Sequence, residues 1–187
     1  MGPHMPLTTQ PLRRKAVAER TKAVKKLLVV VDKTESSDRV LDYLGSLFAK
    51  QRNVHFYLTY LLPRLPAGLL ESGGAEAPAV EERIEASLWL EQDRWMAALD
   101  STSHEILSRS AARLRQAGIR DVIEMCASSP QDNRSAADEV LVIAETRGCR
   151  TIVVGHKARS WFRETRGGHL AEHLVRNARG FSVWVID

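Results

Sequence analysis

The residues best suited to chemistry in this 187-residue chain stand at the ends of two apolar runs. Asp32 closes the run KKLLVVVD, and Gly155 closes CRTIVVG and opens a glycine-containing basic stretch that leads into a helical pattern. A carboxylate can accept hydrogen bonds from a ribose hydroxyl, and a loop that enters a helix N-terminus offers backbone N–H groups to a phosphate. Together they predict a nucleotide crevice, provided that the fold brings the two strand ends together.

The stretch after Gly155 reads GHKARSWFRETRGGH, in which four basic side chains stand against Glu164. Such a loop would make the crevice electropositive. Each feature also has a simpler interpretation. Asp32 can cap the turn that follows it, Gly155 can serve a tight strand-to-loop turn, and the basic side chains can form a solvated face. The coincidence of these features at two strand ends favours the functional interpretation over the simpler ones.

Five apolar or β-branched runs alternate with helical patterns and predict strands over residues 25–32, 53–62, 121–127, 149–155 and 181–187. This alternation is typical of an α/β fold. We therefore expect a single doubly wound domain whose five-stranded, mainly parallel sheet has the order 3-2-1-4-5 and helices on both faces. In that order the first and fourth strands are neighbours, so Asp32 and Gly155 face one crevice at the switch point.

The helical patterns cover residues 35–50, 84–116, a segment ended by Gly148, and 169–180. Ser36, Ser37 and Asp38 are the N-cap candidates of the first helix. A break is expected in the second helix near Asp100 or Ser101. The stretch between the second strand and the second helix is rich in Pro, Gly, Ala and Glu, which predicts a flap over residues 63–88.

The domain itself is expected to span residues 26–187, preceded by a cloning scar and a basic arm over residues 1–25. The net charge is +4, but residues 13–26 alone carry seven basic side chains against one acidic, so the rest of the chain is slightly acidic. Nucleic-acid binding is therefore not expected except through the arm. No apolar run is long enough to cross a membrane. Cys126 and Cys149 fit reduced core or near-core thiols of a cytoplasmic protein.

The arrangement resembles the universal stress protein family over roughly residues 26–187. The likeness lies in LLVVVDKTESSDRVLDYL and in CRTIVVGHKARSWFRETRGGHLAEHLVRNARGFSVWVID. The family has a strand ending in Asp, and later a strand, G-x-x-G, nine residues, G-[S/T] and a helix. The spacing is kept here, with Gly155 and Gly168 in place, but Ala158 stands at the second glycine and His169 at the Ser/Thr position.

The resemblance implies a crevice for ATP or a related adenine nucleotide, with Mg²⁺ beside the phosphates. Val31 and Asp32 would then meet the adenine and ribose. The residues expected near the phosphates are Gly155, Lys157, Ala158, Gly168, His169 and Leu170. The extra methyl group at position 158 and the lost hydroxyl at 169 predict weakened or altered binding. The resemblance further implies a homodimer built through the last strand, residues Phe181–Asp187.

Three other functions compete with a nucleotide sensor. The same fold with a dead pocket would be a dimeric scaffold that acts in a stress response. HLAEH, from His169 to His173, matches a zinc-peptidase pattern but lacks the further downstream ligand that such enzymes need. An adenylating enzyme would need glycines where DKTESS follows the first strand. We find no nucleophile–base pair, so we expect no enzyme activity beyond slow ATP hydrolysis.

Overall fold

The computed structural model describes residues 24–63, 65–69, 78–127, 135–156 and 170–187. Its strands are β1 (Lys25–Val30), β2 (Val54–Leu61), β3 (Val122–Ala127), β4 (Thr151–Gly155) and β5 (Ser182–Ile186). Its α-helices are α1 (Glu35–Phe48), α2 (Pro78–Gln116), α3 (Ala136–Arg147) and α4 (Leu170–Asn177), and a short 3₁₀ helix, η1, covers Ala67–Leu69. Every strand predicted from the sequence is present, with bounds that differ by at most two residues.

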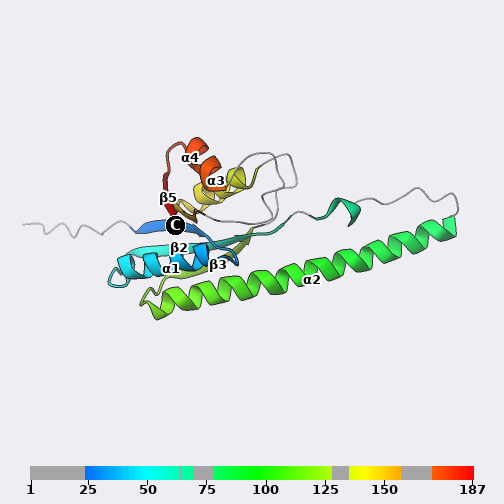
Figure 1. Ribbon diagram of the computed structural model, residues 1–187, viewed down its shortest axis with the longest axis horizontal. Helices are drawn as coiled ribbons and strands as arrows, with labels where there is room; N and C mark the ends of the chain where they lie inside the picture. Colours follow the sequence, from blue (N-terminus) through cyan, green and yellow to red (C-terminus); the bar gives the residue numbers. More distant parts are fainter. Residues whose placement is uncertain (1–23, 64, 70–77, 128–134, 157–169) are drawn as a thin grey trace, which may run out of the picture.

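The five strands form one sheet in the order β3-β2-β1-β4-β5, and every neighbouring pair is parallel. Figure 1 shows the strands between two groups of helices, α3 and α4 on one side and α1 and α2 on the other. The predicted fold class and strand order are therefore confirmed. The central strand β1 pairs with β2 on one side and with β4 on the other, as its continuous run of apolar side chains indicated.

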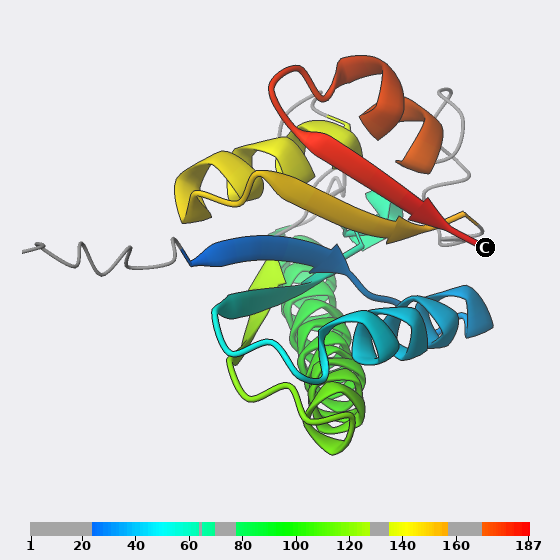
Figure 2. The same ribbon diagram turned by 90° about the vertical axis from the view of Figure 1, so that its left-hand side faces the viewer.

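Two hydrophobic cores lie on opposite faces of the sheet. One is formed by α1 and the C-terminal part of α2 over side chains such as Val29, Phe56 and Leu58. The other is formed by α3 and α4 over side chains such as Leu28, Ile152 and Val154. In Figure 2 these two layers of helices are seen on either side of the twisted sheet. Adjacent residues of β1 alternate between the two cores, which is the period-2 rule for a strand covered on both faces.

Helix α2 corrects two expectations from the sequence. It begins at Pro78, so residues 78–88, which were assigned to the flap, are helical. It is also continuous over 39 residues, without a break near Asp100 or Ser101. Proline is well accommodated in the first turn of a helix, and the residues after it are mostly strong helix formers. At the expected break the hydroxyl of Ser103 donates to the backbone carbonyl of Asp100 at 2.9 Å, a bond that a helix accommodates.

Three helix ends show how local sequence sets the boundaries. The N-cap of α1 is Thr34, whose hydroxyl accepts from the backbone N–H of Ser37, and not one of the three residues proposed from the sequence. The N-cap of α3 is Ser135, which forms a capping box with Asp138. Gly148 ends α3 in the left-handed conformation, with φ of 67°. At these three ends a side-chain or glycine cap satisfies the end groups of the helix.

The two cysteines differ in environment. Cys149 is buried, as expected, and burial raises the pKa of its thiol to about 11. Cys126, in contrast, is exposed on β3, which corrects the expectation of a core or near-core position. Strand β3 forms an edge of the sheet, where side chains have packing neighbours on one side only.

Candidate nucleotide site

The switch point of the sheet lies between β1 and β4, because the chain order reverses there. β1 continues into Val31 and Asp32, and β4 ends at Gly155, so these residues stand at the same carboxyl edge. Helix α1 starts from this edge with Thr34 as its N-cap. In a parallel sheet, this crevice outside the strand ends is where ligands bind.

Asp32 is partly committed to the turn that follows it. Its Oδ1 accepts from the backbone N–H of Thr34 at 2.8 Å and from the Thr34 hydroxyl, while its own N–H donates to Ser37 Oγ at 3.1 Å. Among the described residues no hydrogen bond reaches Oδ2. One carboxylate oxygen therefore fixes the turn, and the other is available to a ligand.

The pKa of the Asp32 carboxyl is raised above its ordinary value. Burial is the main cause, because it disfavours the charged form. The two hydrogen bonds from Thr34 lower the pKa, and the nearby carboxylate of Asp38 raises it further. A ribose hydroxyl that donates to this carboxylate would stabilise its charged form.

Gly155 is required by close packing between β4 and α1. A Cβ added at this position would lie 2.4 Å from Ser36 Oγ and 3.1 Å from Ser36 Cβ. Its φ lies outside the left-handed range, so the requirement is for space and not for an unusual backbone conformation. Sequence reasoning missed Ser36 as the partner of this glycine, since only the tertiary fold brings residues 36 and 155 together.

The remaining site residues predicted from the sequence are only partly described. Val31 is 1% exposed within the core under α1 and α2, and its N–H donates to the carbonyl of Thr59 at 2.9 Å. Leu170 is the first residue of α4 and is buried in the opposite core. Lys157, Ala158, Gly168 and His169 lie outside the described residues. Within the described residues, neither Val31 nor Leu170 makes a hydrogen bond with Asp32.

The charge of the described part of this edge is acidic. Glu35 and Asp38 stand in the first turn of α1, close to Asp32 in sequence. His156, directly after β4, is well exposed, and its Nδ1 lies 3.9 Å from Asp187 Oδ1, a contact that becomes an ion pair when the imidazole is protonated. The four basic residues that the sequence placed in this crevice lie in the stretch 157–169, outside the described residues. Lys33, directly after Asp32, is a described and exposed cation of this edge, and further positive charge for an anionic ligand would have to come from that stretch.

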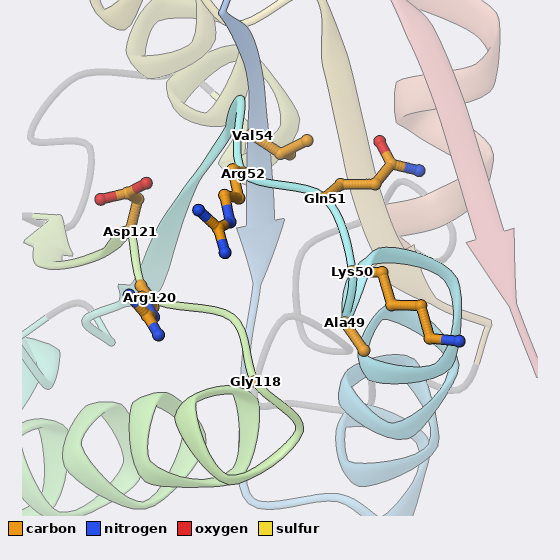
Figure 3. A pocket seen from close by; sticks show the side chains of 8 residues that line it. All are labelled: Ala49, Lys50, Gln51, Arg52, Val54, Gly118, Arg120 and Asp121. Atoms are coloured by element: carbon orange, nitrogen blue, oxygen red, sulfur yellow. The ribbon is translucent and has the colours of Figure 1, made fainter.

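A hollow of about 500 Å³ lies at the other end of the strands, where their amino ends meet. It is formed where the turns after α1 and α2 meet, and Figure 3 shows Lys50 and Gln51 on one side of it and Arg52, Arg120 and Asp121 on the other. The polar side chains that line it belong to the turns before β2 and β3, and they are exposed. Because parallel sheets bind ligands at their carboxyl ends, we do not assign the nucleotide site to this hollow.

The described residues contain neither a cluster of metal-ligating side chains nor a membrane-spanning helix. No group of three or more His, Cys, Asp or Glu side chains in the described ranges could hold a metal ion. Of the HLAEH pattern, His169 lies outside the described residues, and the other four residues, Glu172 and His173 among them, fall within α4. None of the helices in the part of the chain that the structure describes has the length and apolarity needed to cross a bilayer.

The profile of the universal stress protein family matches residues 23–187. The chain belongs to the universal stress protein family. The match covers all five strands and the switch-point edge, and it confirms the resemblance found in the sequence. A search of curated proteins gave no match.

Solved structures of universal stress proteins share the fold at low sequence identity. One from Burkholderia pseudomallei is 18% identical, with a TM-score of 0.53, and the alignment covers 87% of this chain and 96% of that one. A universal stress protein in complex with cAMP is 18% identical, with a TM-score of 0.55 and coverage of 88% and 98%. One from Archaeoglobus fulgidus in complex with dAMP is 18% identical, with a TM-score of 0.50 and coverage of 87% and 98%.

Proposed function

We propose that the crevice between Asp32 and Gly155 binds an adenine nucleotide and that the protein acts as a nucleotide-responsive module of the stress response in the cytoplasm. The observation that carries this proposal is the position of a half-buried carboxylate with one uncommitted oxygen at the switch point of a universal-stress fold. Structural neighbours in complex with cAMP and dAMP support adenine as the base.

In this proposal Asp32 Oδ2 accepts from a ribose hydroxyl while Oδ1 keeps its bonds to Thr34. Val31 would line the base through its backbone, because its side chain is buried in the core. The phosphates would lie against Gly155 and the backbone at the start of α4, with Leu170 at its first turn. Lys157, Ala158, Gly168 and His169 would complete the phosphate site, and Mg²⁺ would accompany ATP beside Asp32.

Thermal unfolding with increasing ATP, ADP, AMP and cyclic AMP, with and without Mg²⁺, tests this function. A ligand present at about one hundred times its Kd stabilises the folded protein by about 2.7 kcal/mol. We expect stabilisation by at least one adenine nucleotide and none by the same concentration of inorganic phosphate. No shift at millimolar concentrations of all four nucleotides would contradict the proposal.

The double variant Ala158→Gly, His169→Ser separates an altered site from a lost one. Restoring the family's residue types should strengthen binding, because the glycine removes a methyl group and the serine restores a hydroxyl donor. Asp32→Ala is the matched loss variant, in which binding should fall about tenfold or more, since one hydrogen bond to a charged group contributes about 1.5–3 kcal/mol. Equal affinity in all three proteins would place the nucleotide elsewhere.

A second function, a homodimeric scaffold, is favoured by the edge strand β5. Val185 is 39% exposed, and a hollow of about 490 Å³ between α1 and β5 is lined by Tyr43, Trp184, Val185 and Ile186. An uncovered strand edge with apolar side chains favours pairing with another chain. Val185→Arg should weaken such a dimer in sedimentation experiments, whereas Val142→Arg, on an exposed face of α3, should not.

A further inference from the structure

Helix α2 extends well beyond the sheet that its C-terminal part covers. Its buried residues begin at Ser103, and none of the residues 80–102 is buried. Figure 1 shows this projecting half reaching past the carboxyl ends of the strands. A hydrogen bond from Gln92 to the carbonyl of Leu69 joins this half of the helix to η1. Most of the surface of residues 80–102 therefore faces solvent.

One face of the projecting half combines acidic and large apolar side chains at helical spacing. Successive members are three or four residues apart, so they lie on one line along the helix. We call this line the acidic stripe, and it consists of Glu82, Glu85, Trp89, Asp93, Met96 and Asp100. All six are exposed, and Trp89 and Met96 are 67% and 52% exposed.

The projecting half carries six carboxylates against two arginines, a net charge of −4. Arg83 and Arg94 lie off the acidic stripe, because each directly follows one of its carboxylates and successive residues are about 100° apart around the helix. No Arg or Lys of α2 stands three or four residues from a member of the stripe, where side chains would meet. An exposed tryptophan between carboxylates is a surface that recognises arginine and lysine, through ion pairs at the flanks and cation–π contact at the ring.

The N-terminal arm of the chain has the complementary chemistry. Its residues 13–24 carry five basic side chains against Glu19. If this segment is helical when bound, one face of it consists of Arg13, Val17, Arg20 and Val24. Cations and small apolar side chains alternate on this face, three or four residues apart, as charged and apolar side chains do on the stripe. The two segments match in the sign of their charge and in the alternation of charged with apolar groups.

The arm of the same chain reaches at most the part of the stripe that lies nearest the sheet. Residue 24 lies at the amino end of the sheet, where α2 also ends, because Val122, the first residue of β3, is level with Leu27 of β1. Trp89 is 27 residues from the end of α2, or about 40 Å along the helix, and Glu82 and Glu85 lie farther out. Arg20 is within about 14 Å of residue 24 even in a fully extended chain, and Arg13 is within about 38 Å. An arm that covers the whole stripe, including Glu82 and Glu85, must therefore come from another molecule.

We propose that the acidic stripe of α2 binds the basic arm, residues 13–24, of a second copy of this chain. Two copies in antiparallel orientation bring the amino end of one sheet beside the projecting helix of the other. Reciprocal exchange of the arms then closes a two-fold dimer in which each stripe is occupied. Because the contact consists of several exposed ion pairs, it weakens strongly with salt.

A charge exchange between two variants of the full chain tests this proposal. The arm variant is Arg13→Glu, Arg14→Glu, Arg20→Glu, and the stripe variant is Glu82→Arg, Glu85→Arg, Asp93→Arg. The wild type should associate reversibly in sedimentation experiments, at least roughly tenfold more tightly in 50 mM than in 500 mM salt. Each variant alone should lose this association, and an equimolar mixture should regain it as a heterodimer. Circular dichroism checks that both variants remain folded.

The matched control is Glu91→Arg, Glu105→Arg, which reverses two exposed carboxylates of α2 that lie off the acidic stripe. It should associate like the wild type. Association that persists in both single-segment variants would contradict the proposal and point to the β5 edge instead. Loss of association only in Arg159→Glu, Arg163→Glu, Arg166→Glu would assign the stripe to the basic loop. A wild type that is monomeric at both salt concentrations would also overturn it.

Discussion

Gly155 and Ser36 are in such close approach that no side chain fits between them: a Cβ on Gly155 would lie 2.4 Å from Ser36 Oγ. This contact fixes the end of β4 against the first turn of α1, next to the turn that holds Asp32. Two residues that are far apart in the sequence thus pack together at the candidate nucleotide site.

The first prediction concerns this contact. Gly155→Ala should destabilise the protein by about 1–3 kcal/mol, because the added methyl group overpacks a site in which Ser36 Cβ and its backbone carbon are also close. Urea denaturation measures the change. Ser36→Gly should recover part of the loss in the double variant, since it removes the two nearest side-chain atoms. Additive losses would show that Gly155 acts through something other than Ser36.

The second prediction concerns the charge of Asp32. Its carboxyl pKa is raised by burial, so the folded protein binds this proton more tightly than the unfolded chain. Ionisation of Asp32 therefore destabilises the fold at every pH above its folded-state pKa, and this penalty disappears below the ordinary value of 3.8. Asp32→Asn, which keeps an acceptor for Thr34, should raise the Tm at pH 7.

The stabilisation by Asp32→Asn should shrink as the pH falls toward 3.8, because wild-type Asp32 then becomes neutral as well. Thermal unfolding at several pH values measures the difference in Tm. A difference that is the same at every pH would show that hydrogen bonding, and not charge, distinguishes the two proteins. The same substitution should weaken nucleotide binding, since the amide is a poorer acceptor for a ribose hydroxyl.

The third prediction concerns the ion pair between α1 and α2. Arg113 holds Asp42 with two hydrogen bonds, Nε to Oδ1 at 2.6 Å and Nη2 to Oδ2 at 2.7 Å, and it also approaches Asp38. The hydrogen bond from Arg113 lowers the pKa of Asp42. Asp42→Asn should lower the free energy of unfolding at pH 7 by roughly 0.5–1 kcal/mol, as expected for an exposed pair with good geometry.

The stabilisation from Asp42 is present above the unfolded pKa and should be lost as the pH falls through the lowered folded-state pKa. The difference between Asp42→Asn and the wild type should therefore vanish in acid. Glu35→Gln is the matched control, because Glu35 makes only a 3.9 Å contact with Arg39 at the surface. A control that loses as much stability as Asp42→Asn would contradict a specific role for the Arg113 pair.

The fourth prediction concerns the cysteines. Because the thiolate is the reactive form, Cys149, which is buried with a pKa of about 11, should resist thiol reagents in the folded protein. Cys126 is exposed and should react readily. Labelling at pH 8 should give one modified thiol per chain when folded and two in denaturant. Cys126→Ser should show none until it unfolds, and rapid labelling of that variant would contradict the burial of Cys149.

Much of this fold could be predicted from the sequence, because its strands are continuous apolar runs and its helices are amphipathic. The run around Leu28 and Val29 is apolar at every position, since β1 is covered on both faces, and this indicated a central parallel strand. Helix α2 was harder to predict. Its projecting half lacks a buried face, and apolar periodicity therefore gave no signal for residues 78–83.

The alternation of strands and helices, and the aspartate and glycine at two strand ends, follow from the order of the residues alone. Three features depend on the folded structure: Gly155 packs on Ser36, Thr34 donates to one oxygen of Asp32, and the acidic stripe projects beyond the sheet. Strands and helices can be recognised in the sequence because each places apolar residues at a characteristic spacing along the chain. Close approaches depend on how distant segments are brought together, and one sequence read alone does not specify those distances.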